Sequence, residues 1–350
     1  MKKFAAMLFV LAFAFITASN VFASVDGTTY EEKEDGSQEE KAPFMIAQSR
    51  LSVAAASILS NEVANVILDN SGNYTFFQKQ GSNAGDVEDR AGITMYIKAF
   101  GGQEKLDMKD YTKFDTTYYG AILGIDTDRK YTDNFDATYG IFVSYAGSQL
   151  KEKDFEDNKF SQNSGFAGLR GNWYIGKLFF GAVLDYGFLA NKAETKVDGE
   201  DNSKDYNTQA IGFSAKAGYN FEVAKRSFTI QPNVVFNSNY LITEEYTIPG
   251  EKKVKSDNII NTAVAPGLKL AKTLGKCWIV SAEGKYVFVQ SNGDVKLDNE
   301  CLPESYYKDY ASCGLGIEKI WGYTVLHLKG HKTFCGRDGY MVNAGIEFKF

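Results

Sequence analysis

Two histidines and a nearby acid are the residues of this chain whose types could support hydrolysis. His327 and His331 flank Lys329, and Asp338 follows a short distance later. A surface protease would place a histidine beside several acids at an outer rim, with the histidine acting as general base. No nucleophile elbow, phosphate-binding loop or dinucleotide-binding motif accompanies them. We therefore expect no enzymatic activity and no cofactor, and a hydrolytic site at His331 and Asp338 is the weaker hypothesis.

The cysteines could form disulfides rather than a metal site. They are Cys277, Cys301, Cys313 and Cys335, and their spacing contains no C-x-x-C pair, so no zinc site is expected. Four cysteines allow three pairings, between which the sequence does not choose. Cys301 and Cys335 both fall in predicted external loops. Because exported compartments permit disulfides, a surface bridge between these two is a hypothesis.

The N-terminus carries the pattern of an export signal. Lys2 and Lys3 precede an uncharged apolar run from Phe4 to Ile16, and the segment closes on Val21-Phe22-Ala23. This pattern predicts a signal peptide over residues 1–23. A membrane anchor is the alternative, but the apolar run is shorter than the roughly 20 residues that a spanning helix needs.

Charge and the segments after the signal narrow the class of protein. Without Lys2 and Lys3, 36 basic residues face 44 acidic ones, a net charge of −8, which argues against nucleic acid as a partner. Residues 24–44 are acidic and predict a disordered tail. Residues 45–90 predict a helix from Met45 to Leu68, stopped at Asp69-Asn70-Ser71-Gly72, and then a polar linker.

From residue 91 to residue 350 apolar and polar residues alternate with a period of two. The run from Ile211 to Phe221 is one example, and the run from Val342 to Phe350 is another. The chain has 26 Phe, 21 Tyr and 33 Gly but only 5 Pro, a composition typical of transmembrane barrels with aromatic residues at both interfaces. About twelve strands are predicted, centred near Met95, Leu123, Phe142, Leu169, Leu184, Phe213, Val234, Ala265, Glu283, Leu315, Leu326 and Ile346. The expected fold is all-β, a 12-stranded antiparallel transmembrane β-barrel, with the N-terminal helix in its lumen.

The connections between the predicted strands alternate in length. Lys151–Lys159, Lys196–Tyr206, Pro249–Asp257 and Ser291–Tyr306 are long and charged, whereas Ile175–Lys177, Leu274–Lys276 and Trp321-Gly322 are tight. An even strand count places both barrel ends on the periplasmic side, so the first connection, Gly102–Phe114, is external. Every second connection after it is then external as well. The long connections fall at these external positions and the short ones at the periplasmic positions, as they do in outer-membrane barrels.

Charged residues at lumen-facing positions of the strands are the candidate binding residues. The main ones are Lys98, Asp126, Arg170, Asp185, Lys216, Glu283, Glu318 and Glu347, with Lys269, Lys285 and Lys349 on the same face. They could bind the helix or select solutes. The purely structural interpretation is that these charges form ion pairs with one another, because buried charges need partners. The mixed signs argue against a strongly selective pore.

Five short motifs in the correct order resemble the autotransporter β-domain, the translocator of type V secretion. They are Ile97–Gly102 (IKAFGG), Tyr119–Asp126 (YGAILGID), Ala217–Phe221 (AGYNF), Ile230–Pro232 (IQP) and Asn343–Phe350 (NAGIEFKF). The sequence departs from the family pattern at Lys98, where Arg is usual, and at Lys216, where Glu is usual.

The resemblance implies a barrel over residues 91–350 that helps a passenger domain reach the cell surface. Here only residues 24–44 separate signal from helix, so we expect almost nothing to translocate. Some members of the family cleave themselves at asparagines in the helix, and Asn61 and Asn65 are present without the adjacent pair of the best-known type.

Function and partners follow as expectations. Phe350 and Phe348 resemble the signal read by the β-barrel assembly machinery, which is expected as a partner beside outer-membrane lipid. A closed barrel hides its edges, so a monomer is expected. The first functional hypothesis is a surface-displaying or structural barrel in the outer membrane. The alternative is a pore for small solutes. The two differ in whether the helix, which carries Arg50 and Glu62, plugs the lumen.

Overall fold

The computed structural model describes one helix and a closed wall of strands. The described residues are 43–69, 92–108, 113–132, 134–152, 159–197, 200–223, 228–247, 253–275, 277–293, 295–297, 300–301 and 307–350. The expected signal peptide, the acidic tail up to residue 42 and the linker 70–91 therefore lie outside the described residues.

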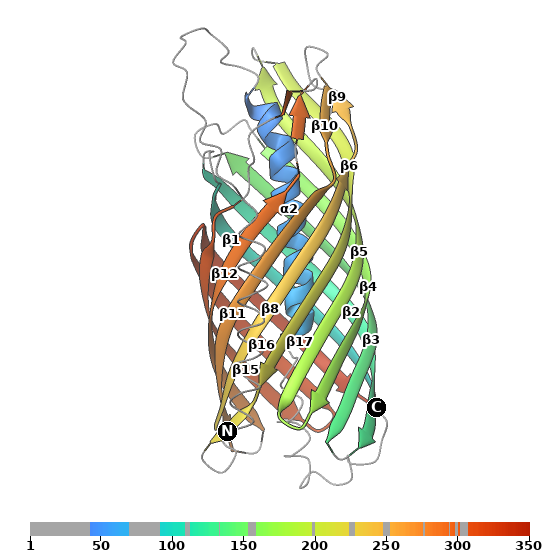
Figure 1. Cartoon of the computed structure of the whole chain (residues 1–350), viewed down its shortest axis with the longest axis vertical. Helices are drawn as coiled ribbons and strands as arrows, with labels where there is room; N and C mark the ends of the chain where they lie inside the picture. The colour runs from blue at the N-terminus through green and yellow to red at the C-terminus, as the bar shows by residue number, and fades with distance from the viewer. Residues whose placement is uncertain are drawn as a thin grey trace.

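Twelve antiparallel strands form the wall of the barrel (Figure 1). This confirms the fold expected from the alternation of apolar and polar residues. They are β1 (Ile93–Asp107), β2 (Lys113–Thr132), β3 (Phe135–Glu152), β4 (Lys159–Ile175), β5 (Leu178–Val197), β6 (Glu200–Tyr219), β8 (Phe228–Thr243), β11 (Ile259–Leu274), β12 (Trp278–Asn292), β15 (Tyr310–Trp321), β16 (Thr324–Cys335) and β17 (Arg337–Lys349). The short β7 (Phe221–Val223) continues β6 along β8 after a break at Asn220. Pairing of β1 with β17 closes the ring.

Tight turns lie at one end of the barrel and long connections at the other, as the alternating lengths of the predicted connections indicate. Three of the tight turns place a glycine in the left-handed region, Gly176 at φ 61°, Gly275 at φ 62° and Gly322 at φ 57°. Only glycine adopts this conformation without strain, which explains its place in these turns. The C-terminus lies at the same end (Figure 1). That end is periplasmic, because in such barrels the short turns face the periplasm.

The external connections are more ordered than the sequence indicates. The expected loop Lys196–Tyr206 is instead an extended hairpin, because β5 runs to Val197 and β6 starts at Glu200. The other long connections contribute β9 (Tyr246–Thr247), β10 (Lys253–Ser256), β13 (Val295–Leu297) and β14 (Glu300–Cys301), which form a separate four-stranded sheet. Strand pairing thus continues above the apolar band, where the outward-facing side chains meet water instead of lipid while inner ones such as Val254 and Val295 stay buried.

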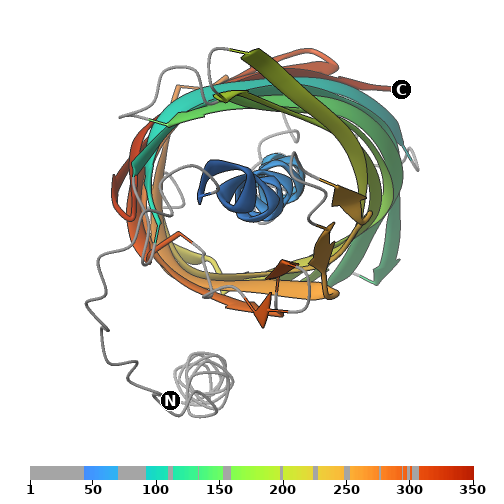
Figure 2. The same cartoon turned by 90° about the horizontal axis from the view of Figure 1, so that it is seen from above.

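Helix α2 (Pro43–Leu68) runs inside the ring (Figure 2), so its expected place in the lumen is confirmed. It begins two residues before the predicted start at Met45. The stretch Leu51–Leu68 has a mean hydropathy of 1.5 and is long and apolar enough to span a membrane, but 94% of it is buried inside the barrel. Apolar residues all around a helix are typical of a helix buried on every side. Its alanines, leucines and valines pack against lumen-facing rings such as Phe100 and Phe166.

The outer face of the barrel carries a continuous apolar band. Leu169 in β4 is 58% exposed, and its cross-strand neighbours Ile141 and Leu184 are exposed as well. Exposed leucine and isoleucine at this density mark a surface that contacts lipid rather than water.

Leu169→Arg is expected to destabilise the folded barrel by about 2–4 kcal/mol, because it places a charge near the middle of the hydrocarbon layer. Guanidinium unfolding in lipid vesicles measures the change in free energy. Gln149→Arg on the external end of β3 is the control, with an expected cost of about 0–1 kcal/mol. Equal costs at the two positions would contradict this assignment of the band.

Candidate functional site

The interface between α2 and the barrel wall contains the largest concentration of buried polar groups. The helix backbone lies closest to the wall formed by β2 to β6 and β8. The opposite wall, formed by β12, β15, β16, β17 and β1, approaches it less closely among the described residues. Two kinds of contact therefore hold the helix, short uncharged side chains on the near wall and long charged ones on the far wall.

Small polar residues of the helix bond to the amides of the near wall. Ser60 Oγ donates to Asn239 Oδ1 over 2.6 Å, and Asn239 Nδ2 donates to Asn61 Oδ1 over 2.8 Å. Asn261 Nδ2 of β11, the strand that pairs with β8, donates to Ser57 Oγ. All of these side chains are buried, so each bond also satisfies a group that would otherwise be costly inside the barrel.

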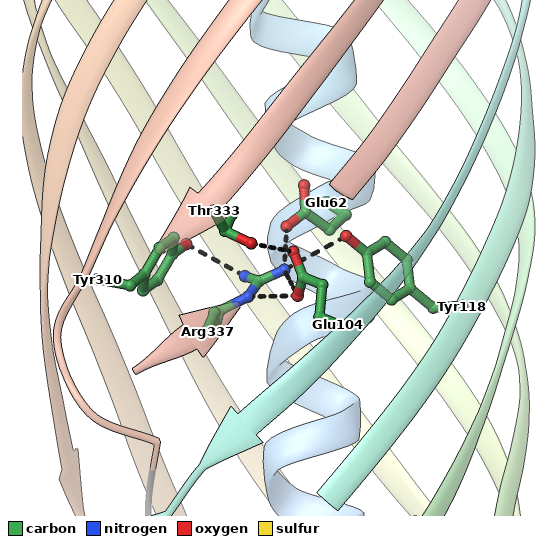
Figure 3. A network of polar contacts seen from close by, with 6 residues as sticks. All are labelled: Glu62, Glu104, Tyr118, Tyr310, Thr333 and Arg337. Atoms are coloured by element: carbon green, nitrogen blue, oxygen red, sulfur yellow. Dashed lines mark hydrogen bonds and ion pairs between the residues drawn. The ribbon is translucent and has the colours of Figure 1, made fainter. Parts of the chain in front are cut away.

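Arg337 on the far wall joins the helix to the barrel through one guanidinium group (Figure 3). Its Nη2 lies 2.9 Å from Glu62 Oε1 on the helix, and its Nε donates to Glu104 Oε2 of β1 over 2.7 Å. Nη1 donates to the hydroxyl of Tyr310 over 3.1 Å, and Thr333 Oγ1 donates to the free oxygen of Glu104. The Arg337 side chain is 1% exposed and that of Glu104 is 0% exposed. Buried charges are tolerated only with such complete pairing.

Cations surround the other end of the helix. Lys98 Nζ donates to the carbonyl oxygen of Val66 over 3.4 Å. Lys329 Nζ lies 2.9 Å from Asp69 and 2.8 Å from Glu283 of β12. The last carbonyls of a helix lack partners within it and carry partial negative charge, so lysines stabilise this end.

The lumen-facing charges predicted from the alternation are placed inside, but not in one cluster. Lys98 bonds to the helix and lies 3.5 Å from Glu347. Arg170 lies 3.2 Å from Asp126, away from the Arg337 cluster. The others are dispersed around the helix: Asp185 accepts from Ser60, Glu283 pairs with Lys329, Lys216 lines a cavity, and Glu318 is buried.

Two essential members of the site were missing from the predicted set, Arg337 and Glu104. Glu104 falls within Gly102–Phe114, predicted as an external connection, and Arg337 follows Cys335, predicted to lie in another, because the strands extend further than the alternation indicated. The signal that could have found them is the parity of their positions. Counting back by twos from Asn343 reaches Arg337, and counting forward from Lys98 reaches Glu104. Both lie on the lumen-facing parity of their strands.

The structure separates the two residues of the hydrolytic hypothesis and leaves the disulfide hypothesis open. His331 faces the lumen near Glu283, whereas Asp338 is exposed and pairs with Lys332, so the two lie on opposite faces of the wall. Cys335 is described as a free thiol, and its hypothesised bridge to Cys301 stays a prediction. The side chain of Cys301 lies outside the described residues. Cys335 ends β16 with a positive φ of 73°.

Small cavities lie beside the C-terminal half of the helix. Two cavities of about 20 Å³ flank it, each with room for about one water molecule. One is lined by Lys216 and Lys285, and the other reaches from His331 to Glu104. Among the described residues, no group of three or more His, Cys, Asp or Glu side chains could hold a metal ion.

A closed antiparallel wall, an apolar outer band and a polar lumen together define a β-barrel protein of the outer membrane. The family model described as autotransporter beta-domain matches residues 95–300, more than half of the chain. The chain therefore belongs to the autotransporter β-domain family, and it resides in the outer membrane. No curated protein matches its sequence significantly.

Solved translocator domains share the fold. The translocator domain of autotransporter NalP from Neisseria meningitidis matches with a TM-score of 0.64 at 12% identity, covering 85% of this chain and 99% of that chain. The transport unit of the autotransporter AIDA-I from Escherichia coli matches at 0.62 and 18% identity, covering 80% and 99%. The β domain of the Bordetella autotransporter BrkA matches at 0.59 and 16% identity, covering 74% and 99%. At these identities the likeness shows the fold alone.

Proposed function

We propose that this barrel holds α2 as a plug and presents the chain that precedes the helix at the cell surface. The observation that carries the proposal is the bonding of the helix on both sides. Ser60 and Asn61 bond to the near wall, and Glu62 bonds to Arg337 on the far wall. Three consecutive residues thus fix both the rotation and the height of the helix.

The direction of the helix supports display on the outside. Its N-terminal part lies beside β10 and β13 of the external sheet (Figure 1). Its last residues lie deep in the lumen, where Lys98 and Lys329 bond to Val66 and Asp69. Pro43, where the described helix begins, therefore lies at the external end of the barrel, and Asp69 lies toward the opposite end.

Packing argues against an open pore for solutes. Between Leu51 and Leu68 the helix buries apolar side chains such as Leu59, Val63 and Ile67 almost completely. Each such side chain contributes about 1.5–3 kcal/mol when it is removed from water. Expelling the helix would return these residues to water and break the ion pair between Glu62 of the helix and the buried Arg337 of the wall. The plugged state is therefore the stable one.

Single-channel conductance in a planar bilayer tests the plug. The mature chain is expected to stay closed, and a variant lacking residues 24–72 is expected to conduct steadily. Deletion of residues 24–42 alone is the matched control, because it shortens the chain but retains α2, and it is expected to stay closed. Heat-modifiable mobility on gels verifies that each variant has folded as a barrel.

The same measurement distinguishes the alternative function. A mature chain that conducts as well as the truncated one would exclude the plug and make passage of small solutes the leading function. For the display part of the proposal, an epitope inserted at Glu34 is expected to bind antibody on intact cells. The same epitope inserted after Gly293, which follows the external end of β12, verifies that antibody reaches the barrel.

A further inference from the structure

One buried carboxyl group in the lumen has no cation beside it. Asp185 of β5 is 2% exposed, and its Oδ1 lies 3.4 Å from Ser60 Oγ of the helix. It lies at the level of the apolar band, because the preceding residue, Leu184, belongs to that band on the outer face. Its cross-strand partners are Gly168 of β4 and Gly212 of β6, so neither neighbouring strand offers it a side chain. The carboxyl group occupies the space over Gly212, where a Cβ atom would lie 2.5 Å from Asp185 Oδ2.

The charged groups on the elements packed around Asp185 do not pair with it. On β4, Arg170 forms its ion pair with β2 instead. On β6, Lys216 borders a cavity that Asp185 does not line, and on the helix Glu62 is bonded to the far wall. At the level of Asp185, β3 and β8 present uncharged side chains, and β5 itself has no other charged residue of the same parity. Among the described residues, Asp185 therefore lacks a counter-charge.

The hydrogen bonds at Ser60 also leave Asp185 without a donor of its own. The Ser60 hydroxyl has one hydrogen, and Asn239 Oδ1 is the nearer of its two acceptors, at 2.6 Å against 3.4 Å for Asp185. The other oxygen of Asp185 has no hydrogen-bond partner among the described residues. An ionised carboxylate would be left almost unsolvated here, and buried carboxyl groups avoid that cost by keeping their proton.

A proton on Asp185 completes the hydrogen bonding between the helix and the near wall. A protonated Asp185 can donate to Ser60 Oγ. The chain then runs in one direction, because Ser60 donates to Asn239, and Asn239 Nδ2 donates to Asn61 Oδ1. Every hydrogen in this chain has one acceptor, which is not the case when Asp185 is ionised.

We propose that Asp185 is a proton-binding site through which external pH controls how firmly the barrel holds its plug. The inference rests on the proposed plug function of α2. In the closed state Asp185 is neutral and bonds to Ser60, one of the three consecutive residues that fix the helix. Loss of the proton places an unpaired charge against the helix, and movement of the helix relieves it by admitting water. The closed state is therefore favoured at acidic pH and weakened as the pH rises.

A single proton sets the size of the effect. In the open state Asp185 meets water and titrates as an ordinary aspartate, at about pH 4. From there up to the pH at which the closed barrel releases its proton, the closed state holds one proton more than the open state. Over that range the ratio of open to closed molecules rises about tenfold for each pH unit.

Single-channel recordings of the full mature chain between about pH 5 and about pH 9 test the proposal. Openings of the natural chain are expected to be rarest at the acidic end and to increase by up to about tenfold for each unit. Asp185→Asn retains an N–H donor toward Ser60 but cannot ionise, so it is expected to stay closed throughout. His327→Gln/His331→Gln is the control, because histidine ordinarily titrates near neutral pH, and it should retain the pH dependence of the natural chain.

Four results would overturn the role of Asp185. They are openings of the natural chain that do not change with pH, a pH dependence that persists in Asp185→Asn, a pH dependence that the histidine control abolishes, and a dependence on sodium concentration in place of pH, which would assign a metal cation to the site. Failure of the plug itself gives a different result, a natural chain that conducts steadily at every pH. A natural chain that stays closed at every pH, while the variant lacking residues 24–72 conducts, contradicts only the role of Asp185.

Infrared spectroscopy carries the test if Asp185→Asn does not fold. A protonated carboxyl group gives a carbonyl stretching band that a carboxylate lacks, and the natural chain is expected to show such a band at neutral pH. Ser60→Ala removes the acceptor of the proposed hydrogen bond and is expected to shift the band. Absence of the band at neutral pH, or a band that Ser60→Ala leaves unchanged, overturns the proposal.

Discussion

Arg337→Met is expected to loosen the plug and to destabilise the folded protein by about 3–5 kcal/mol, because it leaves the buried carboxylates of Glu62 and Glu104 without their cation. Methionine retains much of the volume of the arginine stem, so the cost comes from the uncompensated charges rather than from a void. The change is expected both in guanidinium unfolding and as frequent openings in single-channel recordings of the full chain.

Two further variants separate charge from packing at this position. Arg337→Met/Glu62→Gln/Glu104→Gln removes all three charges and is expected to recover most of the lost stability, since replacing a complete buried ion cluster is often nearly neutral. Asp338→Asn acts on the adjacent residue but breaks only an exposed ion pair with Lys332, so no measurable change is expected. If Arg337→Met and Asp338→Asn behave alike, the role assigned to the Arg337 cluster is wrong.

Deletion of Phe350 is expected to remove most of the protein from the outer membrane of living cells. Phe350 is 65% exposed, and its N–H donates to the carbonyl of Ile93 over 2.9 Å at the periplasmic end of the β1–β17 seam. With Phe348 it forms the apolar end of the last strand, which is the edge that we propose the assembly machinery binds before the barrel closes.

An in vitro measurement distinguishes assembly from stability for this residue. Loss of one phenylalanine side chain from the lipid face can cost at most about 3 kcal/mol, so the variant is expected to refold into detergent micelles. Tyr340→Ala at the external end of the same strand is the control, and it should reach the outer membrane normally. If the Phe350 variant neither reaches the outer membrane of cells nor refolds into micelles, Phe350 contributes to the stability of the barrel and not specifically to its assembly.

The barrel itself could be predicted because its two faces meet different surroundings. Lipid outside and a polar lumen inside impose opposite preferences on successive residues, and Ile211–Phe221 shows that alternation directly. The helix could be predicted because Met45–Leu68 lacks both alternation and glycine. Beyond the membrane this constraint ends, and the predicted strands were too short there. The β5–β6 hairpin left one local signal, Asp198-Gly199, which favours a tight turn.

The contact partners of the lumen side chains could not be predicted, even where their inward orientation was predicted correctly. Period two places Lys98 and Asp126 on the inner face, but it gives no information about which strands lie across the barrel from each other. Arg337 reaches Glu62 from 275 residues away in the sequence. Such a contact depends on barrel diameter and on the off-centre position of the helix, and neither quantity is encoded in a local pattern.

The wall of the barrel is higher on one side than on the other, so the two sides project to different distances from the membrane. β5 and β6 have 20 residues each, whereas β15 and β16 have 12 each. For tilted strands that difference corresponds to about 20 Å along the barrel axis. An antibody or a phage tail fibre descending from the medium therefore touches the β5–β6 side first.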